Sequence, residues 1–410
     1  MKLPIYMDCH ATTPVDPVVV DAMLPFLREH FGNAASRTHS FGWVAEEAVD
    51  RARARVARLL GAEAREIVFT AGATESAFLG IRGAAYARAP QRRHLVTTAI
   101  EHKAVLSTCQ ELEKDGFELS VVGVGSDGVV DPQEIRAALR PDTSLVCVMA
   151  ANNEIGTLQP LQEIGALTRE RDIVFFVDAA QAVGKVPLDV NALHIDLLSL
   201  SAHKMYGPKG IGALYVRRSG RRVRLAHQSP GGGQERGLRS GTVNVPGAVG
   251  LGAACSVARE HLDAEAARLL ELRERLRIGL QSRLDDVTVN GSLEHRLPGN
   301  LNMSFAGAQG ESLLMQLNDV AVSPGAACDS KNAEPSHVMR AIGVADDLAR
   351  SSIRFGLGRF NTTEEVDYVI EKVVRAVESL RAESPLYADA ADSAEQRLSA
   401  TQAHARVEEP

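Results

Sequence analysis

A lysine and an aspartate each follow an apolar, strand-like run in this chain. Asp178 ends the run Phe175-Phe176-Val177, and Lys204 comes between the run Leu197-Leu198-Ser199-Leu200 and a turn rich in Gly and Pro. A buried carboxylate needs a partner or it protonates. A lysine with the usual pKa of about 10.4 must be desolvated or bound as an imine to react near neutral pH. The pair is the pattern expected for pyridoxal phosphate, with Asp178 at a protonated pyridine nitrogen.

Each of these residues also has a plainer interpretation. Asp178 can cap the helix that follows it, and Lys204 can be an ordinary surface lysine. A third segment also has both a functional and a structural interpretation. Residues 67–76 predict a strand, a turn of small residues and a helix start, where free N–H groups and the helix dipole can hold a phosphate. A simple strand-to-helix turn explains that segment equally well.

A cysteine lies near the middle of a polar stretch that contains Gly and Pro. The stretch covers residues 322–336 and the cysteine is Cys328. Its composition predicts a mobile loop, in which a thiol can visit a buried site and then reach a partner. We expect structural roles for the other thiols, because most of them lie in apolar patterns. These are Cys9, Cys109, Cys147 and Cys255.

Short β-rich runs alternate with longer helical patterns through the first two-thirds of the chain. This alternation predicts an α/β fold, with a mostly parallel sheet sandwiched by helices. Ligands of such sheets bind at the carboxyl ends of the strands. The predicted strands are residues 67–70, 94–98, 119–122, 145–150, 173–177, 197–200 and 212–216. The predicted helices are residues 45–60, 103–114, 132–139 and 161–171.

The length of 410 residues favours a large domain with a smaller one. Leucines at helical spacing predict a long amphipathic helix over residues 263–284, which would begin the smaller domain. We therefore expect a large domain at 16–262 and a small domain from 1–15 and 263–385, which carries the cysteine loop. Residues 386–410 lack a clear apolar face and predict a flexible tail.

Composition narrows the class of protein. The net charge of −7 argues against general affinity for nucleic acid or anionic membranes. Five widely spaced cysteines without a CxxC pair argue against a disulfide framework and a structural zinc site. No apolar run approaches the roughly 18 residues of a membrane span, and the N-terminus lacks the apolar core of a signal peptide. We expect a cytoplasmic protein.

A local run of arginines contrasts with the negative net charge of the whole chain. It reads as a solvated loop or hairpin, with a docking patch for an acidic partner as the alternative. Its members are Arg217, Arg218, Arg221, Arg222 and Arg224.

Eight short motifs occur together in one order. They are Ala11-Thr12-Thr13-Pro14, Gly72-Ala73-Thr74-Glu75-Ser76, Glu101-His102-Lys103, Asn152-Asn153-Glu154-Ile155-Gly156, Asp178 with Gln181, His203-Lys204, Arg239-Ser240-Gly241-Thr242 and Ser352-Ile353-Arg354-Phe355. On these motifs the chain resembles the class V, fold-type I pyridoxal-phosphate enzymes, and within them the cysteine desulfurases of the IscS/NifS type. The resemblance runs from Leu3 to about Leu380. It implies a fold-type I transferase with a smaller α+β domain and pyridoxal 5′-phosphate as cofactor.

The resemblance implies a role for each matching residue at the cofactor ring. Lys204 is implied to bind the cofactor covalently, and Asp178 to pair with its pyridine nitrogen. His102 is implied to lie over the ring face and to move protons, and Gln181 to bond the phenolate oxygen. The plainer alternative for His102 is a packed histidine with no chemical role.

Other matching residues are implied to hold the phosphate and the substrate. Asn153 is implied to hold cofactor or substrate, and Arg354 to bind the substrate carboxylate in a fork. Thr242 is implied to reach the phosphate of a neighbouring subunit, which implies a homodimer. A structural salt bridge for Arg354 and a turn hydroxyl for Thr242 are the alternatives. The implied phosphate ligands in the same subunit are Ala73, Thr74, Ser201 and His203.

The implied reaction removes sulfur from L-cysteine, leaving L-alanine and a persulfide on Cys328. The freed Lys204 is a natural base for the α-proton. A thiol with a pKa near 8.5 is mostly protonated at pH 7, so either His102 or the substrate must deprotonate Cys328. An iron–sulfur scaffold or another sulfur-acceptor protein is the implied recipient, with a brief contact between Cys328 and an iron centre during transfer.

Some positions depart from the family pattern. Cys9 and His10 replace a common Tyr-Ser pair, Pro324 is expected to stiffen the cysteine loop, and Asp329 places a negative charge beside Cys328. The tail lacks the aromatic-basic ending that docks the iron–sulfur scaffold. Three other functions stay open: an aminotransferase, a selenocysteine lyase and a non-catalytic protein that retains the fold. The Cys328 loop counts against the first, and Lys204 together with Cys328 against the last.

Overall fold

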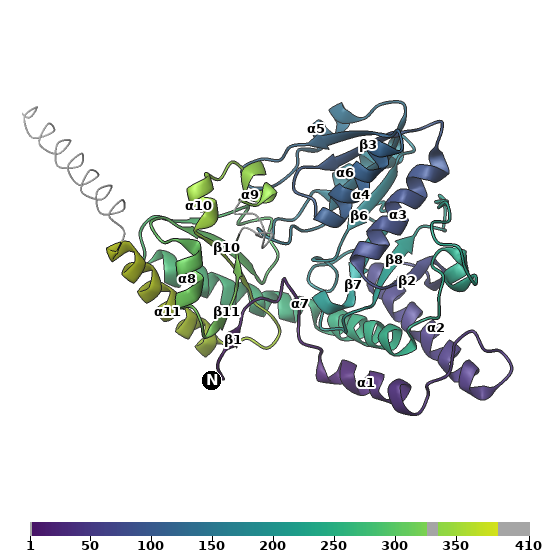
Figure 1. The fold of residues 1–410 in the computed structure, drawn as a ribbon, viewed down its shortest axis with the longest axis horizontal. Coiled ribbons are helices and arrows are strands. Elements are labelled where there is room, and N and C mark those ends of the chain that lie inside the picture. The colour runs from purple at the N-terminus through teal and green to yellow at the C-terminus, as the bar shows by residue number, and fades with distance from the viewer. Residues whose placement is uncertain (1, 326–334, 384–410) are drawn as a thin grey trace, which may run out of the picture.

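The computed structural model describes residues 2–325 and 335–383 of the chain. A seven-stranded sheet forms the larger part of the molecule, with strand order β2-β8-β7-β6-β5-β3-β4 (Figure 1). β8 is antiparallel to both neighbours, and the other pairs are parallel. The strands are β2 (Ile67–Thr70), β3 (His94–Thr98), β4 (Glu118–Val122), β5 (Thr143–Met149), β6 (Val174–Asp178), β7 (Leu197–Ser201) and β8 (Gly212–Val216).

Helices cover both faces of this sheet, which explains its continuous apolar strands. Phe175 and Phe176 are adjacent on β6 and point to opposite faces, yet both are fully buried. Phe175 packs in the cluster that includes residues of α2 (Ser40–Leu60) and α6 (Leu161–Glu170). Phe176 packs in the cluster that includes residues of α3 (Ala73–Arg88) and α4 (Lys103–Lys114).

The predicted α/β architecture is confirmed. Three of the predicted strands have the bounds of β2, β3 and β8, and the others differ by one or two residues at an end. The predicted helix at 103–114 is α4, and the one at 132–139 is α5 (Pro132–Ala138). The antiparallel pairing of β8 was not predicted, because strand runs do not record direction.

A second, smaller sheet packs with its own core. Its order is β12-β13-β10-β9, and all of its pairs are antiparallel. The strands are β9 (Val287–Val289), β10 (Asn300–Phe305), β12 (Ser323–Pro324) and β13 (Ser352–Gly356). Beside it, β1 (Ile5–Tyr6) pairs in parallel with β11 (Val320–Ala321), so the N-terminus joins this part of the chain. Its helices are α8 (Gly310–Gln316), α9 (His337–Ala341), α10 (Asp346–Arg350) and α11 (Thr363–Ala382).

One long helix, α7 (Val245–Gln281), connects the two parts (Figure 1). Its first half packs on α1 (Pro17–Arg28) and α2, and it also contacts α11 and β10 of the smaller part. The helix predicted over 263–284 was therefore too short at its start. Residues 247–255 are buried all round, so they lack the one-sided apolar period on which that prediction depended. The domain boundaries at 15 and 262 stay a prediction.

Candidate active site

A cavity of about 960 Å³ opens at the carboxyl ends of the parallel strands. Ten of the predicted site residues line it, from the larger sheet, its loops and β13 of the smaller sheet: Ala73, Thr74, His102, Asn153, Asp178, Gln181, Ser201, His203, Lys204 and Arg354. Thr242 is exposed and is not among the lining residues. Cys328 and residues 326–334 around it lie outside the described residues.

One end of the cavity is formed by a helix start. β2 ends at Thr70 and α3 begins at Ala73, so the N–H groups of the first turn of α3 have no carbonyl partner within the helix. Ser201 ends β7 close by, since a Cβ atom on Gly72 would lie 3.6 Å from the Ser201 Oγ. Free N–H groups at the positive end of a helix dipole, beside a hydroxyl, suit an anion such as a phosphate.

His203 adds a neutral side chain to this end. Burial, with the neighbouring Lys204 and Lys209, lowers the pKa of His203 to about 4. Its Nδ1 lies 3.1 Å from the Thr12 Oγ1. His203 therefore serves as a hydrogen-bonding group near neutral pH, not as a cation.

Asp178 ends β6 and is 6% exposed. Its Oδ1 accepts hydrogen bonds from the Ala180 N–H at 3.1 Å and the Ser199 hydroxyl at 2.9 Å. Its Oδ2 accepts none from the described residues. The capping interpretation thus accounts for one oxygen, and the second is left for a group in the cavity.

Lys204 projects into the cavity from the short 3₁₀ turn Ala202–Lys204 after β7. Its Nζ donates to the carbonyl oxygens of His10 at 2.6 Å and Ala11 at 2.8 Å. Burial and the nearby Arg354 lower the pKa of Lys204 to about 8, against the opposing effects of Asp8 and Asp178. With this pKa, about a tenth of the amine is neutral near pH 7. Its place in the cavity lining and its two hydrogen bonds to backbone carbonyls argue against an ordinary surface lysine.

His102 caps α4. Its Nδ1 accepts from the Ala104 N–H at 3.1 Å, which places the proton of the neutral ring on Nε2. Burial lowers the pKa of His102, helped by Lys204, His337 and Lys103 and opposed by Asp178. A neutral ring with its proton on Nε2 can donate that proton but cannot accept another there.

Arg354 lies across the cavity from the larger sheet, on β13. Its guanidinium donates to the Asn153 carbonyl at 2.8 Å and the Ser323 hydroxyl at 3.0 Å, and it forms an ion pair with Asp8 at 2.9 Å. The Nε is buried and has no hydrogen-bond partner among the described residues. The structural salt bridge is therefore real, and one N–H group is still free for a ligand.

Gln181 is held by residues that sequence reasoning did not single out. Its Oε1 accepts from the Lys185 Nζ at 2.9 Å and lies 3.3 Å from the His10 Nδ1. Its Nε2 donates to the His10 carbonyl at 2.9 Å. His10 also lines the cavity, and its departure from the family pattern was the only sequence signal for it. Lys185 had no local signal.

Glu101 is a further buried carboxyl that was noted only as part of a motif. It is 0% exposed, and its Oε1 accepts from the Met149 N–H at 2.7 Å and the Thr98 hydroxyl at 2.8 Å. Its Oε2 has no hydrogen-bond partner in the part of the chain that the structure describes. Burial raises the pKa of Glu101 to about 8, so this group is mostly protonated at neutral pH.

Comparison with known proteins agrees with this geometry. The family model described as "Aminotransferase class-V" matches residues 5–369. The cysteine desulfurase IscS of Anaeromyxobacter dehalogenans is 60% identical over 387 residues, which cover 94% of this chain and 96% of that protein. The human cysteine desulfurase is 54% identical over 384 residues, with 94% of this chain and 84% of that protein covered.

Solved structures give the same result. A NifS-like protein superposes with a TM-score of 0.85 at 39% identity, covering 91% of this chain and 99% of that chain. A structure described as "SspA in complex with cysteine" has a TM-score of 0.77 at 38% identity, covering 87% of this chain and 100% of that chain. The chain belongs to the class-V aminotransferase family and, within it, to the cysteine desulfurases.

Proposed function

We propose that this protein takes sulfur from L-cysteine, releases L-alanine and holds the sulfur as a persulfide on Cys328. One observation carries the proposal. The Lys204 amine and the Asp178 carboxylate reach the same cavity from the ends of the adjacent strands β7 and β6, with Arg354 across from them. A reactive amine, an acid for a ring nitrogen and a carboxylate anchor in one place are the parts that chemistry on an amino acid needs.

The donor set fits pyridoxal phosphate, the cofactor of this family. The open N–H groups at the start of α3, with Ser201 and His203, suit its phosphate. The free Oδ2 of Asp178 suits its pyridine nitrogen, and Lys204 is the amine that would hold it covalently. When bound, the cofactor supplies an electron-withdrawing ring that stabilises negative charge on the α-carbon of the substrate.

Lys204 and His102 divide the proton transfers between them. The lowered pKa of Lys204 lets its neutral amine accept the α-proton of cysteine near neutral pH. His102 holds a proton on Nε2 and serves as a donor in the same cavity. Of the two bases open for the thiol of Cys328, this tautomer favours the substrate over His102.

Arg354 and Asn153 orient the substrate. The unpartnered Arg354 Nε offers a charged donor to the substrate carboxylate, and the Asn153 carbonyl fixes the guanidinium from one side. The C–S bond of cysteine then breaks as the Cys328 thiolate bonds to its sulfur. The departing β-carbon takes the electron pair and is protonated, and a proton is returned to the α-carbon, which gives alanine.

We propose a homodimer in which Thr242 serves the neighbouring subunit. Thr242 is exposed and away from the lining of its own cavity. Large apolar side chains are also exposed after α1 and in the first turn of α2, with Phe31 at 68%, Trp43 at 56% and Phe41 at 51%. Exposed apolar side chains close together support association. Sedimentation should give twice the 44.0 kDa of one chain, and a fully active monomer would contradict this assembly.

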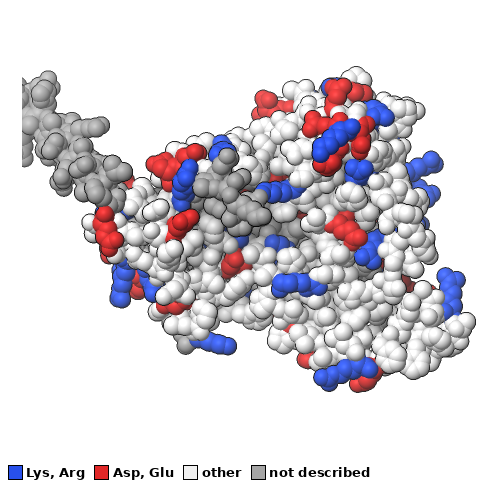
Figure 2. All heavy atoms as spheres, in the orientation of Figure 1, with Lys and Arg blue, Asp and Glu red and all other residues white. Residues whose placement is uncertain are grey.

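We propose a cytoplasmic sulfur donor for an iron–sulfur scaffold or another acceptor protein. Four of the described cysteines are buried and free, as expected in a reducing compartment. Within residues 2–325 and 335–383, no helix has the length and hydropathy of a membrane span. Acidic and basic side chains are interspersed on the face shown in Figure 2, which supports protein acceptors over nucleic acid. The proposed contact of Cys328 with iron lies outside the described residues.

The test measures alanine and sulfide formed from cysteine in the presence of a reductant and added pyridoxal phosphate. Lys204→Ala should abolish both products. Cys328→Ala should abolish sulfur transfer, while Cys255→Ala, which removes a buried thiol of the core, should retain it. Full sulfur release by the Cys328→Ala variant would overturn the proposal. Selenocysteine as substrate tests the alternative: selenide release that persists in Cys328→Ala, with no reaction on cysteine, would indicate a selenocysteine lyase.

A further inference from the structure

We propose that Lys185 is a positioning residue that fixes the side-chain amide of Gln181 as a hydrogen-bond donor toward the cofactor. The inference rests on the proposed function, because it concerns the same cavity. It assigns a role to a residue that does not itself line that cavity.

The directions of two hydrogen bonds fix the orientation of the Gln181 amide. The Lys185 Nζ donates to the Gln181 Oε1 at 2.9 Å, and its ammonium form, about half of the population near pH 7, has no acceptor to offer in return. The Nε2 of Gln181 donates to the His10 carbonyl at 2.9 Å. An exchanged amide would place its N–H groups against an ammonium and its oxygen against a carbonyl. Both contacts therefore favour one orientation.

In that orientation, Gln181 keeps one hydrogen-bond donor free. Gln181 is 5% exposed and lines the cavity. One Nε2 hydrogen is used by the His10 carbonyl, and the other has no acceptor among the described residues. Gln181 thus presents a donor, not an acceptor, to whatever fills the cavity. The phenolate oxygen of pyridoxal phosphate requires a donor.

Two groups hold the Gln181 Oε1, and they lie at different distances from it. The His10 Nδ1 lies at 3.3 Å, near the limit for a hydrogen bond, whereas the Lys185 Nζ lies at 2.9 Å. Without Lys185 the amide oxygen would keep only the longer contact. Lys185 is therefore the stronger restraint on this end of the side chain.

Lys185 lies among several charged groups, so the effect of its charge must be distinguished from the effect of its hydrogen bond to Gln181. Burial and the nearby Lys204 and Arg354 lower the pKa of Lys185 to about 7, while Cys9 and Glu265 act in the opposite direction. Removing Lys185 could change the cofactor through lost charge as well as through Gln181. The experiment must distinguish these two routes.

The readout is the absorbance of pyridoxal phosphate bound to the protein, titrated with pH without substrate. A donor to the phenolate oxygen stabilises the deprotonated chromophore, so losing that donor raises the pH midpoint. Gln181→Leu should raise the midpoint by roughly half to one pH unit, the worth of one hydrogen bond. Lys185→Met should raise it by less, roughly a few tenths of a unit, because His10 still holds the amide.

The double variant, Lys185→Met with Gln181→Leu, distinguishes an effect through Gln181 from a through-space effect of charge. If Lys185 acts through Gln181, Lys185→Met adds nothing to Gln181→Leu. An equal shift in both backgrounds would show a through-space charge effect and overturn the proposal, as would no shift from Lys185→Met alone. Lys114→Met is the matched control, because this lysine is 72% exposed and pairs only with Glu111. It should leave the midpoint unchanged.

Lys185→Arg guards against a folding defect. It keeps a cationic donor, so its midpoint should stay nearer to wild type than that of Lys185→Met, and equal shifts would contradict the positioning role. Failure of the proposed function looks different. In that case wild-type protein would develop no new absorbance band with added pyridoxal phosphate, whereas failure of this inference alone leaves a normal band with an unmoved midpoint.

Discussion

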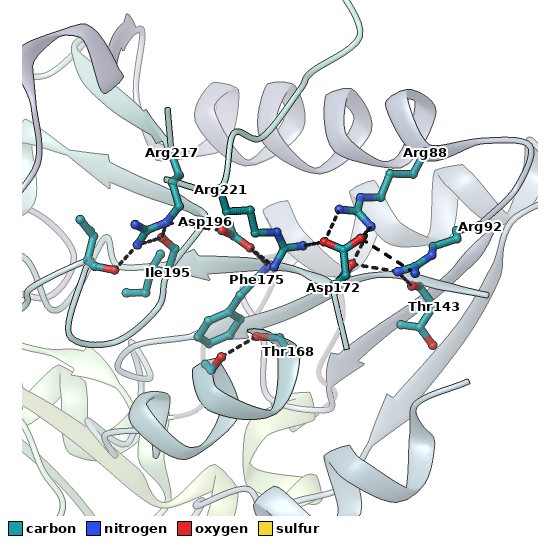
Figure 3. Close-up of polar contacts among 12 residues, drawn as sticks. Arg88, Arg92, Thr143, Thr168, Asp172, Phe175, Ile195, Asp196, Arg217 and Arg221 are labelled. Atoms are coloured by element: carbon teal, nitrogen blue, oxygen red, sulfur yellow. Dashed lines mark hydrogen bonds and ion pairs between the residues drawn. The ribbon is translucent and has the colours of Figure 1, made fainter. Parts of the chain in front are cut away.

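Buried charges gather at both ends of the same seven-stranded sheet. At the carboxyl ends of the parallel strands they form the cavity around Lys204 and Asp178. At the amino ends they form a second cluster (Figure 3). Asp196 immediately precedes β7 there, and Asp172 lies just before β6. Arg217 follows β8, which is antiparallel and so ends at the same edge.

The charges of the second cluster pair with one another, although the Asp196 Oδ1 and the Arg221 Nη2 are held by ion pairs and make no hydrogen bond to the described residues. Arg221 bridges Asp196 at 3.3 Å and Asp172 at 3.0 Å, and Arg217 pairs with Asp196 at 3.4 Å. Arg217 also donates to the carbonyls of Ile195 and Val190 (Figure 3). Arg88 completes the exposed end of the cluster at Asp172, at 3.2 Å.

The cavity, by contrast, leaves polar atoms open. Among the described residues, the buried Arg354 Nε and His10 Nε2 have neither a hydrogen bond nor an ion pair, and one oxygen of Asp178 accepts no hydrogen bond. An unpaired buried polar atom costs free energy unless a ligand satisfies it. In these two regions, the charges of the amino-end cluster are paired within the protein, whereas the cavity keeps groups without an ion-pair partner that a ligand can engage.

The same comparison corrects the interpretation of the basic run. Arg217 is 5% exposed and belongs to the amino-end cluster with Arg221, so neither a solvated loop nor a docking patch describes these two residues. Arg218, Arg222 and Arg224 line a surface hollow instead, together with His227 and Arg236. For these three the two interpretations stay open.

The largest effect, on the free energy of unfolding, is expected when the amino-end cluster is broken. Asp196→Ala leaves Arg217 and Arg221 without their buried partner, and it should lower the free energy of unfolding by about 3–5 kcal/mol. Urea unfolding measures this loss. The matched control is Asp367→Ala, which removes an exposed partner of Arg275 and should cost far less.

Activity should separate the two regions in that experiment. The folded Asp196→Ala protein should keep its rate of alanine formation per molecule. A selective loss of rate without loss of stability would mean that the cluster belongs to the catalytic machinery.

The next effect acts on the cavity. Asp178→Asn keeps an oxygen for the Ser199 and Ala180 donors but removes the negative charge from the ring nitrogen. The rate of alanine formation should fall about 10²–10³-fold, with little change in the urea midpoint. Asp196→Asn is the matched change at the other end, where stability should fall and the rate should not. A normal rate for Asp178→Asn would contradict the assigned role.

The smallest effect concerns Glu101, a carboxyl that has no cation beside it. Its pKa rises from 4.5 in the unfolded chain to about 8 in the fold. Between these values the folded protein holds a proton that the unfolded chain releases, so Glu101 makes stability fall as pH rises. Glu101→Gln cannot titrate and should remove this slope.

Urea unfolding at pH 5.5 and 7.5 measures that slope. The difference in unfolding free energy between wild type and Glu101→Gln should change by about 2–2.5 kcal/mol across this range, in favour of the variant at higher pH. A constant difference would show that Glu101 is ionised in the fold. Glu63→Gln, on the surface, is the control and should leave the downward slope in place.

Local pattern was sufficient for much of the fold and of the candidate site. Short β-rich runs identified every strand of the larger sheet. In six of the seven strands both faces are covered and each position is buried, whereas the edge strand β4 is mostly exposed or half-buried. Asp178 and Lys204 could be paired in advance, since residues at the carboxyl ends of neighbouring parallel strands meet at one edge. The motifs Glu101-His102-Lys103 and Ser352-Ile353-Arg354-Phe355 identified His102 and Arg354 as candidate site residues.

Only the tertiary structure decided which groups are completed by distant parts of the chain. His10 and Gln181 are 171 positions apart, and the Lys204 amine finds its acceptors 194 and 193 positions away. Lys185, Arg217 and the first half of α7 look ordinary in sequence, because periodicity records one-sided burial and nothing of what packs from elsewhere. The sequence determined the chemical groups and the strands that carry them. Packing between remote segments determined which of those groups are paired and which stay open for a ligand.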